Sequence, residues 1–392
     1  MTQSLFESKW SATKTALLDG LSGQRKDTLS TVLENAKYQL TESATAGATQ
    51  AGNIASLNKV MLPLIRRVMP AVIANEILGV QPMTGPVGQI HTLRVRYADS
   101  KAGITAGTEA LSPFDIAKAY SGNEQLNNAN PAAANTAKLE GLAGNRMSVQ
   151  IMKEVVEAKS RKLSARWTFE SAQDANALHG IDIEAEIMQA LAQEITVEID
   201  QELINNLRVL QGNAPVTYDQ GAVSGTATYV GDEHAALAVM INQQANLVAA
   251  RTRRGAANWA IVSPNALTVL QSATTSSFAR TTEGTFEAPT NVKLAGTLNG
   301  TMRIFVDTYA ADNEKVLIGY KGATETDAAA FYCPYIPLMS TGPVMDPDTF
   351  EPVVSFMTRY GYLELTNSAN SLGNAADYLS AVGIETANLK FF

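Results

Sequence analysis

The chain has 392 residues, of which 45% are hydrophobic, 17% are charged and one is a cysteine. This length allows two or three domains of about 150 residues each, with a large buried core. The net charge of −8 argues against a general nucleic-acid-binding protein, and a single cysteine excludes an intrachain disulfide. Ordinary soluble domains contain about 25% charged residues, so the low charge content predicts a surface that is partly covered by other chains.

No apolar run is long enough to predict a membrane span. The N-terminal residues lack the charged-then-apolar pattern of a secretion signal, so we expect synthesis in the cytoplasm.

Residues 1–56 are predicted to form an N-terminal arm. Apolar residues at helical spacing, among them Trp10, Leu17 and Leu29, predict two short helices before a small-residue linker at 43–52. Short helices with narrow apolar stripes do not form a core alone. We therefore expect the arm to pack on itself, on the main body or on another subunit.

The next part of the chain starts the main body. It is expected to hold a proline-interrupted helix over 60–80 and a strand over 90–97. Residues 98–145 are rich in Ala, Gly and Asn and have little periodicity, which predicts a long projecting loop or hairpin. Its return strands are predicted at 146–156 and 158–169.

Residues Ile181–Leu210 form the strongest predicted element. Apolar residues recur every four positions from Ile183 to Leu207, with no Gly or Pro, which predicts one helix of about 30 residues. Seven acidic residues lie between Asp182 and Glu202, and only Arg208 opposes them.

The second half of the chain alternates between helical and strand-like segments. We expect helices over 233–250 and 264–272, and strands over 259–262, 302–306 and 315–318. Residues 328–365 are predicted to form strands broken by five prolines, and residues 366–392 are predicted to form a polar tail.

Few residues point to catalysis or to a cofactor. His91, His179 and His234 lie far apart without metal-ligand spacing, and the sequence holds no GxSxG, P-loop or GxGxxG motif. Cys333 has no adjacent base and is predicted to be a buried small hydrophobe. We expect no catalytic residue, metal or cofactor.

The acidic face of the long helix has three interpretations. Glu194, Glu198 and Glu202 share one side at i, i+4 spacing, which fits a solvated face, a face covered by a basic partner, or a carboxylate metal site. Carboxylate metal sites of helical bundles also use Glu-x-x-His, and this helix contains no histidine.

A basic partner exists within the chain, over residues 146–166. Its basic residues outnumber Glu154 and Glu157, so the two segments carry opposite charge and predict a docking register. Charge alone does not say whether docking is within or between subunits. The candidate contact residues are Lys153, Lys159, Arg161, Lys162, Arg166, Glu184, Glu194, Glu198 and Glu202.

Several strings of the sequence resemble the major capsid proteins of T-even-type tailed phages. They are Arg66–Pro70, Gly79–Pro86, Phe331–Tyr335, Asp346–Val354 and Thr358–Gly361. The resemblance covers most of residues 57–365 and implies an α+β, Hong Kong 97-type phage capsid fold. Its parts would be an N-terminal arm (1–56), the first part of a peripheral domain (57–94), an extended loop (95–166), the rest of that domain with its spine helix (167–211), an axial domain (212–325), and peripheral return strands with a C-terminal tail (326–392).

The resemblance also implies a function that is not enzymatic. The chain would assemble with itself in hexamers, with pentamers left open, to form an icosahedral shell around packaged double-stranded DNA that it contacts only weakly. Vertex, portal, scaffold and possible decoration proteins would be its other partners, and the virion capsid its location, after synthesis and assembly in the bacterial host cytoplasm. We expect the basic segment 146–166 of one subunit to lie over the acidic helix of its neighbour.

Two alternatives to this function stay open. One is the same fold in a vertex subunit or in the shell of an encapsulating compartment. The more distant one is a metal enzyme that uses the carboxylates of the long helix.

Two departures from the resemblance matter. Longer relatives carry an inserted domain near the extended loop, and about 70 residues here leave little room for one, so reinforcement would come from the arm or from decoration proteins. Leu40-Thr41-Glu42 fits the pattern at which relatives lose their N-terminal segment, which makes Glu42 a candidate processing site. We expect Glu42 to stay uncut and the arm to be retained.

Overall fold

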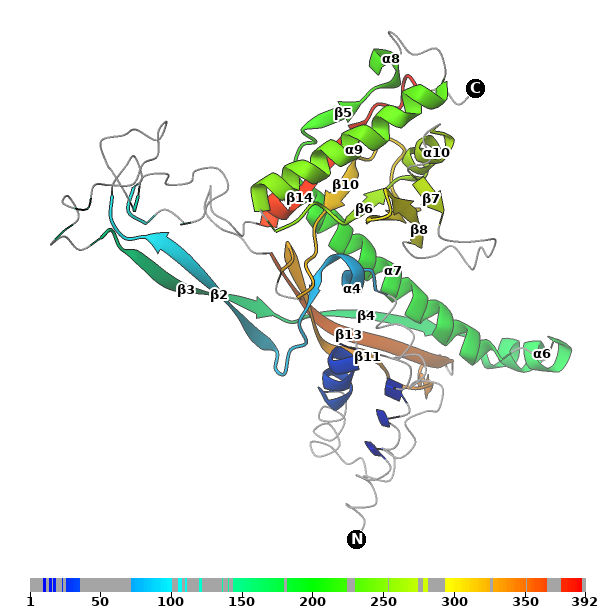
Figure 1. The fold of residues 1–392 in the computed structure, drawn as a ribbon. Coiled ribbons are helices and arrows are strands. Elements are labelled where there is room, and N and C mark those ends of the chain that lie inside the picture. The colour runs from blue at the N-terminus through cyan, green and yellow to red at the C-terminus, as the bar shows by residue number, and fades with distance from the viewer. Residues whose placement is uncertain are drawn as a thin grey trace.

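The computed structural model describes the body of the chain in ten stretches. These are residues 72–100, 144–179, 182–223, 230–252, 254–273, 278–280, 293–324, 327–349, 351–364 and 375–389, with separate residues between 10 and 35 and between 105 and 140. Two β-sheets, a projecting two-stranded hairpin and a long helix make up this part of the molecule (Figure 1). The α+β fold class predicted from the sequence is confirmed.

The five-stranded sheet carries the long helix on one face. Its strands are β1 (Gly79–Val80), β11 (Ala330–Ser340), β13 (Pro352–Glu364) and β12 (Val344–Met345) in that order, with β4 (Lys159–Arg166) paired to β13. The helices beside it are α4 (Ala74–Ile77), α6 (Phe169–His179) and α7 (Ile183–Gln211). The buried side of α7 and alternate side chains of β13 form one apolar core.

All strands of the seven-stranded sheet come after α7 in the sequence. Its order is β5 (Val216–Tyr218), β14 (Leu379–Ile384), β10 (Val316–Gly319), β6 (Trp259–Val262), β9 (Met302–Val306), β8 (Lys293–Leu298) and β7 (Phe278–Arg280). The helices are α8 (Gln220–Val223), α9 (Val230–Thr252) and α10 (Pro264–Ser272), and η2 (Ala375–Tyr378) precedes β14. Alternate residues of β6 enter different cores. Trp259 and Ile261 pack in the core around α7, whereas Ala260 and Val262 pack in the core around α9.

The hairpin consists of β2 (Val87–Tyr97) and β3 (Met147–Glu157), paired antiparallel along their whole length. It projects from the body (Figure 1). Where the strands lead into residues 98–145, the rings of Tyr97 and Tyr120 lie 4.5 Å apart and Ala110 is buried against them. This small core was not foreseen, because the segment shows no periodicity.

Helix α7 confirms the strongest sequence prediction. It begins after Asp182, whose carboxylate accepts hydrogen bonds from the N–H groups of Glu184 and Ala185, and it ends at Gly212 with φ of 73°. The predicted helix over 60–80 is wrong in its described part, because α4 ends at Ile77 and the next residues form strand β1.

Two predicted boundaries are also wrong. The second return strand, which we assigned to the extended loop ending at 166, is β4 and pairs with β13 in the five-stranded sheet. The predicted polar tail contains β14, which lies between β10 and β5 in the seven-stranded sheet and is almost fully buried. Its strand neighbours are far away in sequence, so the tail alone gave no sign of burial.

The described part of the arm is attached to the body. Leu29 and Leu33 pack with Trp10, Leu17 and Leu18. At the end of helical residues 26–35, the Asn35 amide donates hydrogen bonds to the carbonyls of Met83 (2.7 Å) and Tyr335 (2.9 Å). Glu42 and the linker at 43–52 lie outside the described residues.

Candidate assembly interface

One face of the hairpin exposes a row of apolar side chains. Met147, Val149, Ile151 and Val155 alternate along β3 and are 54, 62, 69 and 47% exposed. Side chains two residues apart lie on the same side of a strand, so these four form one strip, which we call the apolar row. Lys153 lies in the same row and is exposed. Exposed apolar side chains gathered on one face of a strand make this row a candidate interaction site.

The base of the hairpin is held by packing on the opposite face. Val156 is buried, and Gly361 of β13 leaves the space that it occupies. A Cβ at Gly361 would lie 2.5 Å from Val156 Cγ2. Val156 can therefore pack against β13 in this way only because position 361 carries no side chain.

Arg161 joins the charged segments within one chain. Its guanidinium donates to Glu198 (2.5 Å), to Glu202 (2.5 Å) and to the Tyr360 hydroxyl (2.6 Å). The Tyr360 hydroxyl in turn donates to Glu202. Burial raises the pKa of Glu202, but the hydrogen bonds from Tyr360 and Arg161 and the nearby positive charge of Arg161 and Lys159 outweigh it and lower that pKa below its usual value.

This cluster corrects one prediction and weakens an alternative. The contact between Arg161 and the acidic helix, which we placed between neighbouring subunits, lies inside the subunit because β4 and α7 pack together in the same chain. The carboxylates of Glu198 and Glu202 are bound by Arg161, so they are not available to a metal ion. Within the described stretches, no group of three or more His, Cys, Asp or Glu side chains is arranged to hold a metal.

Lys159 also comes close to the acidic face, where its positive charge acts on Glu202, but the remaining predicted contact residues form no ion pair with that face within the described part of the chain. Lys159, Lys162 and Glu194 are exposed, and Arg166 lies 3.8 Å from Glu351 of its own chain. Glu184 is half-buried and lines a pocket at the start of α7.

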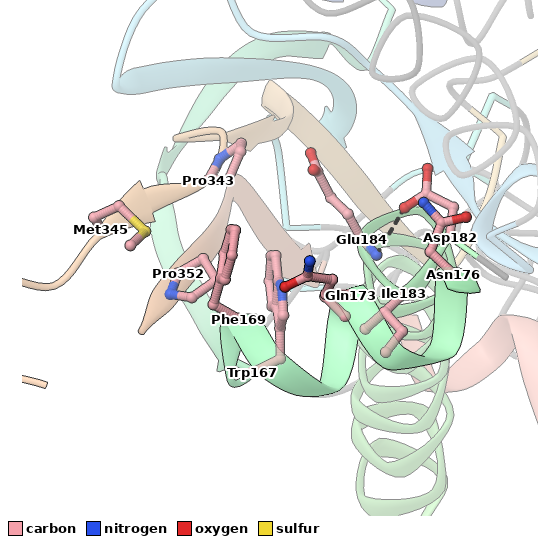
Figure 2. Close-up of a pocket in the computed structure, with 11 residues that line it drawn as sticks. Trp167, Phe169, Gln173, Asn176, Asp182, Ile183, Glu184, Pro343, Met345 and Pro352 are labelled. Atoms are coloured by element: carbon pink, nitrogen blue, oxygen red, sulfur yellow. Dashed lines mark hydrogen bonds between the residues drawn. The ribbon is translucent and has the colours of Figure 1, made fainter. Parts of the chain in front are cut away.

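That pocket lies where α6, α7 and the β12 turn meet, and it has a volume of about 460 Å³. We call it the tip groove. Figure 2 shows the aromatic rings of Trp167 and Phe169 side by side, with Met345 and Pro352 beyond them and Glu184 on the other side. Phe169 is 61% exposed and Met345 45% exposed, so the walls are apolar surface open to water.

Sequence reasoning missed both apolar surfaces. The alternation from Met147 to Val155 predicts a strand, but alternation alone does not say whether the apolar face is covered by the same chain. The tip groove has no local signal, because Phe169 and Met345 are far apart in the sequence.

Two buried carboxylates connect α7 to its surroundings. Asp307, at the end of β9, is bound by Arg208 (3.1 Å) and Gln201 (2.7 Å) of the helix. Asp200 accepts a hydrogen bond from the Ile73 N–H at 2.9 Å. Cys333 is buried as predicted, and burial raises the pKa of its thiol to about 12.

None of the helices in the described ranges has the length and apolar character needed to cross a membrane.

A family model described as major capsid protein Gp23 matches residues 54–384. The major capsid protein of Vibrio phage KVP40 is 30% identical over 431 residues, which cover 86% of this chain and 83% of the relative. The major capsid protein of Enterobacteria phage T4 is 30% identical over 412 residues, which cover 83% of this chain and 78% of the relative. The solved capsid of Myoviridae phage XM1 is 9% identical, with 78% of this chain and 90% of that chain covered and a TM-score of 0.44.

The family match spans more than half of the chain and includes the long helix, the hairpin and both sheets. These are the parts that the Hong Kong 97-type capsid fold was expected to supply. The chain belongs to the Gp23 family of major capsid proteins, which are structural proteins of tailed phages and not enzymes.

Proposed function

We propose that this chain forms the hexamers of an icosahedral phage shell by burying the apolar row of β3 against a neighbouring copy. The observation that carries the proposal is the exposure of four large apolar side chains on one face of a projecting hairpin. An isolated two-stranded hairpin is marginally stable in water, so a covered face would stabilise it. The low charge content of the chain supports the same conclusion.

Each of the two sheets would belong to a different domain of the subunit in such a hexamer. The five-stranded sheet with α7 would be the peripheral domain, and the seven-stranded sheet the axial domain around the sixfold axis. Lys153, Lys159, Lys162, Arg166, Glu184 and Glu194 are exposed or half-buried and would contribute charged contacts at the rims of these interfaces.

The shell would enclose double-stranded DNA with weak contact, because a chain of net charge −8 does not bind a polyanion tightly. Synthesis and assembly would take place in the bacterial host cytoplasm. A closed and filled shell also needs a portal and a scaffold protein. Its vertices would be formed either by this chain or by a separate vertex protein. Decoration proteins would strengthen the shell.

The test is a charge placed in the apolar row. We expect Ile151→Asp to lower the yield of closed shells at least about tenfold, because a buried carboxylate without a partner costs several times the 1.4 kcal/mol that corresponds to tenfold. Sedimentation velocity and negative-stain electron microscopy of the full chain, expressed with scaffold, measure the yield.

The control is Gln150→Asp, on the other face of the same strand, which adds the same charge at an exposed position. It should assemble like the parent chain. Equal yields from Ile151→Asp and the parent would contradict the role of the apolar row.

A further inference from the structure

We propose that Asn299 is a site of spontaneous modification, where the backbone nitrogen of Gly300 displaces the side-chain amide and turns Asn299 into aspartate or isoaspartate. Asn299-Gly300 is the one Asn-Gly dipeptide of the chain. It forms the turn between β8 and β9 in the seven-stranded sheet, and both residues are exposed. The inference goes beyond the proposed assembly function and does not depend on it.

The shape of the turn explains why this dipeptide is present. The φ angles of Asn299 and Gly300 are 54° and 70°, and the Thr301 N–H donates to the Leu298 carbonyl at 3.3 Å, as in a type I′ turn. Glycine adopts positive φ without a clash, and asparagine is one of the few other residues that visit this region. The hairpin therefore favours a sequence in which no side chain shields the nitrogen that follows an asparagine.

The nitrogen of Gly300 is open to attack by base. A Cβ built on Gly300 would have no atom of the described residues within 4 Å, apart from those of its chain neighbours. Once a base has removed the N–H proton, the nitrogen forms a bond to Cγ of Asn299. The bond from Cγ to Nδ2 then breaks, and Nδ2 takes up a proton and leaves as ammonia.

The product of this step is a succinimide ring, which water opens in two ways. Opening at Cγ gives aspartate in an unchanged backbone. Opening at the main-chain carbonyl carbon of Asn299 gives isoaspartate, whose backbone runs through Cβ and Cγ. In both cases one water is consumed and one ammonia is released, so no oxidant or further reactant is needed.

Helix α9 holds the atom that has to leave. Asn299 Nδ2 donates a hydrogen bond of 2.8 Å to Oδ1 of Asn242, which lies in the middle of α9. The carboxamide must give up this bond before Nδ2 departs, so Asn242 slows the reaction. Because the bond is exposed, its loss should raise the rate about fivefold, which corresponds to about 1 kcal/mol.

Peptide mass spectrometry of the full chain tests the site. Trypsin cuts after Lys293 and Arg303 and releases Leu294–Arg303, in which Asn299 is the only side-chain amide. Relative to an unincubated sample, we expect this peptide to gain the mass that separates an acid from an amide. The gain should be faster at mildly alkaline than at neutral pH, because the attacking nitrogen has to lose its proton. A protease that cuts before aspartate but not before isoaspartate separates the two products.

Three variants in α9 test the role of the hydrogen bond. Asn242→Ala should react about fivefold faster than the parent chain. Asn242→Asp keeps an acceptor for Nδ2 and should react no faster than the parent. The matched control is Asn246→Ala, at an exposed position one turn further along the helix, which should react at the parent rate.

Two results would overturn the modification site. One is a peptide that remains an amide in both the parent and Asn242→Ala. The other is a product without isoaspartate, because direct hydrolysis of the side chain by water gives aspartate alone. Equal rates in Asn242→Ala and the parent would overturn the protection by Asn242.

Discussion

Asp200 is a carboxylate buried in the core between α7 and the segment that starts at Ile73. One oxygen accepts the Ile73 N–H, and the other, Oδ2, has no hydrogen-bond partner among the described residues. Burial raises the pKa of Asp200 to about 7, helped by the negative charge of Asp307, although the hydrogen bond from Ile73 acts in the opposite direction. The folded protein therefore favours the protonated form at pH values below about 7.

The sign of this shift predicts a pH-dependent stability. An aspartate with a raised pKa stabilises the fold fully below its unfolded value of about 4, and that contribution is lost as the pH rises through 7. Across this window the loss is at most roughly 4 kcal/mol. We expect Asp200→Asn, which stays neutral and keeps an acceptor for Ile73, to show a smaller loss of unfolding free energy between pH 5 and 8. Urea unfolding of the unassembled chain at several pH values measures it.

Glu194→Gln serves as the matched control, because this carboxylate is exposed on the same helix. A pH dependence that is the same in Asp200→Asn as in the parent chain would mean that Asp200 does not titrate in this range.

At the level of elements, the sequence predicts long regular segments well and segments with distant partners poorly. Helix α7 follows from four-residue periodicity without Gly or Pro, a signal carried by its own residues. Strand β14 is only six residues long and contains Gly383, and its burial comes from β10 and β5. Strand β4 was recognised as a strand but assigned to the hairpin, because sequence does not say which partner a strand chooses.

The junction of the hairpin with β13 gives a prediction for an element. In Gly361→Ala, the added Cβ would meet Val156 Cγ2 at 2.5 Å, and the backbone carbonyl of Glu157 lies 3.2 Å away. Val156 is stiff at χ1 because it is β-branched, so the base of the hairpin must shift. We expect a loss of about 1–3 kcal/mol in unfolding free energy together with fewer shells. Urea unfolding and particle counts by electron microscopy measure the two effects.

The second substitution Val156→Ala in the same chain should recover part of the shell yield, since it removes the methyl group in the way. Gly85→Ala is the control, because the nearest atom to its Cβ is 3.9 Å away. A normal shell yield from Gly361→Ala would show that the hairpin direction does not depend on this contact.

For the whole molecule, the opposite charge of segment 146–166 and helix α7 correctly predicted that they meet, but not whether they meet within one subunit or between two. Arg161 does meet Glu198 and Glu202, as the charge patterns of the two segments predicted, yet the contact is internal. A charge pattern is the same for every copy of a chain, so it does not distinguish an internal contact from one between subunits. Exposure adds what charge lacks, because the apolar side chains of β3 are left open to water by the described residues of their own chain.

The described part of the arm is joined to the body through Asn35, at the end of its helical residues 26–35. We predict that it is retained, because its helical residues bury Val32 and Leu33 and because Asn35 supplies donors to two carbonyls of the body. Mass spectrometry of purified particles should therefore find residues 1–42 still attached. Chains that begin at Ser43, after Glu42, would contradict retention.

The attachment itself is tested through Asn35. In Asn35→Ala, the carbonyls of Met83 and Tyr335 lose a donor, and a net loss of about 1–2 kcal/mol corresponds to roughly tenfold more frequent release of the arm. Limited proteolysis of assembled particles should then cut the arm roughly tenfold faster than in the parent. Thr31→Ala is the matched control, because its hydroxyl bonds only to the Asp27 carbonyl within the same helix among the described residues. If both variants are cut at the parent rate, the arm is held by its apolar side chains and the Asn35 bonds contribute little.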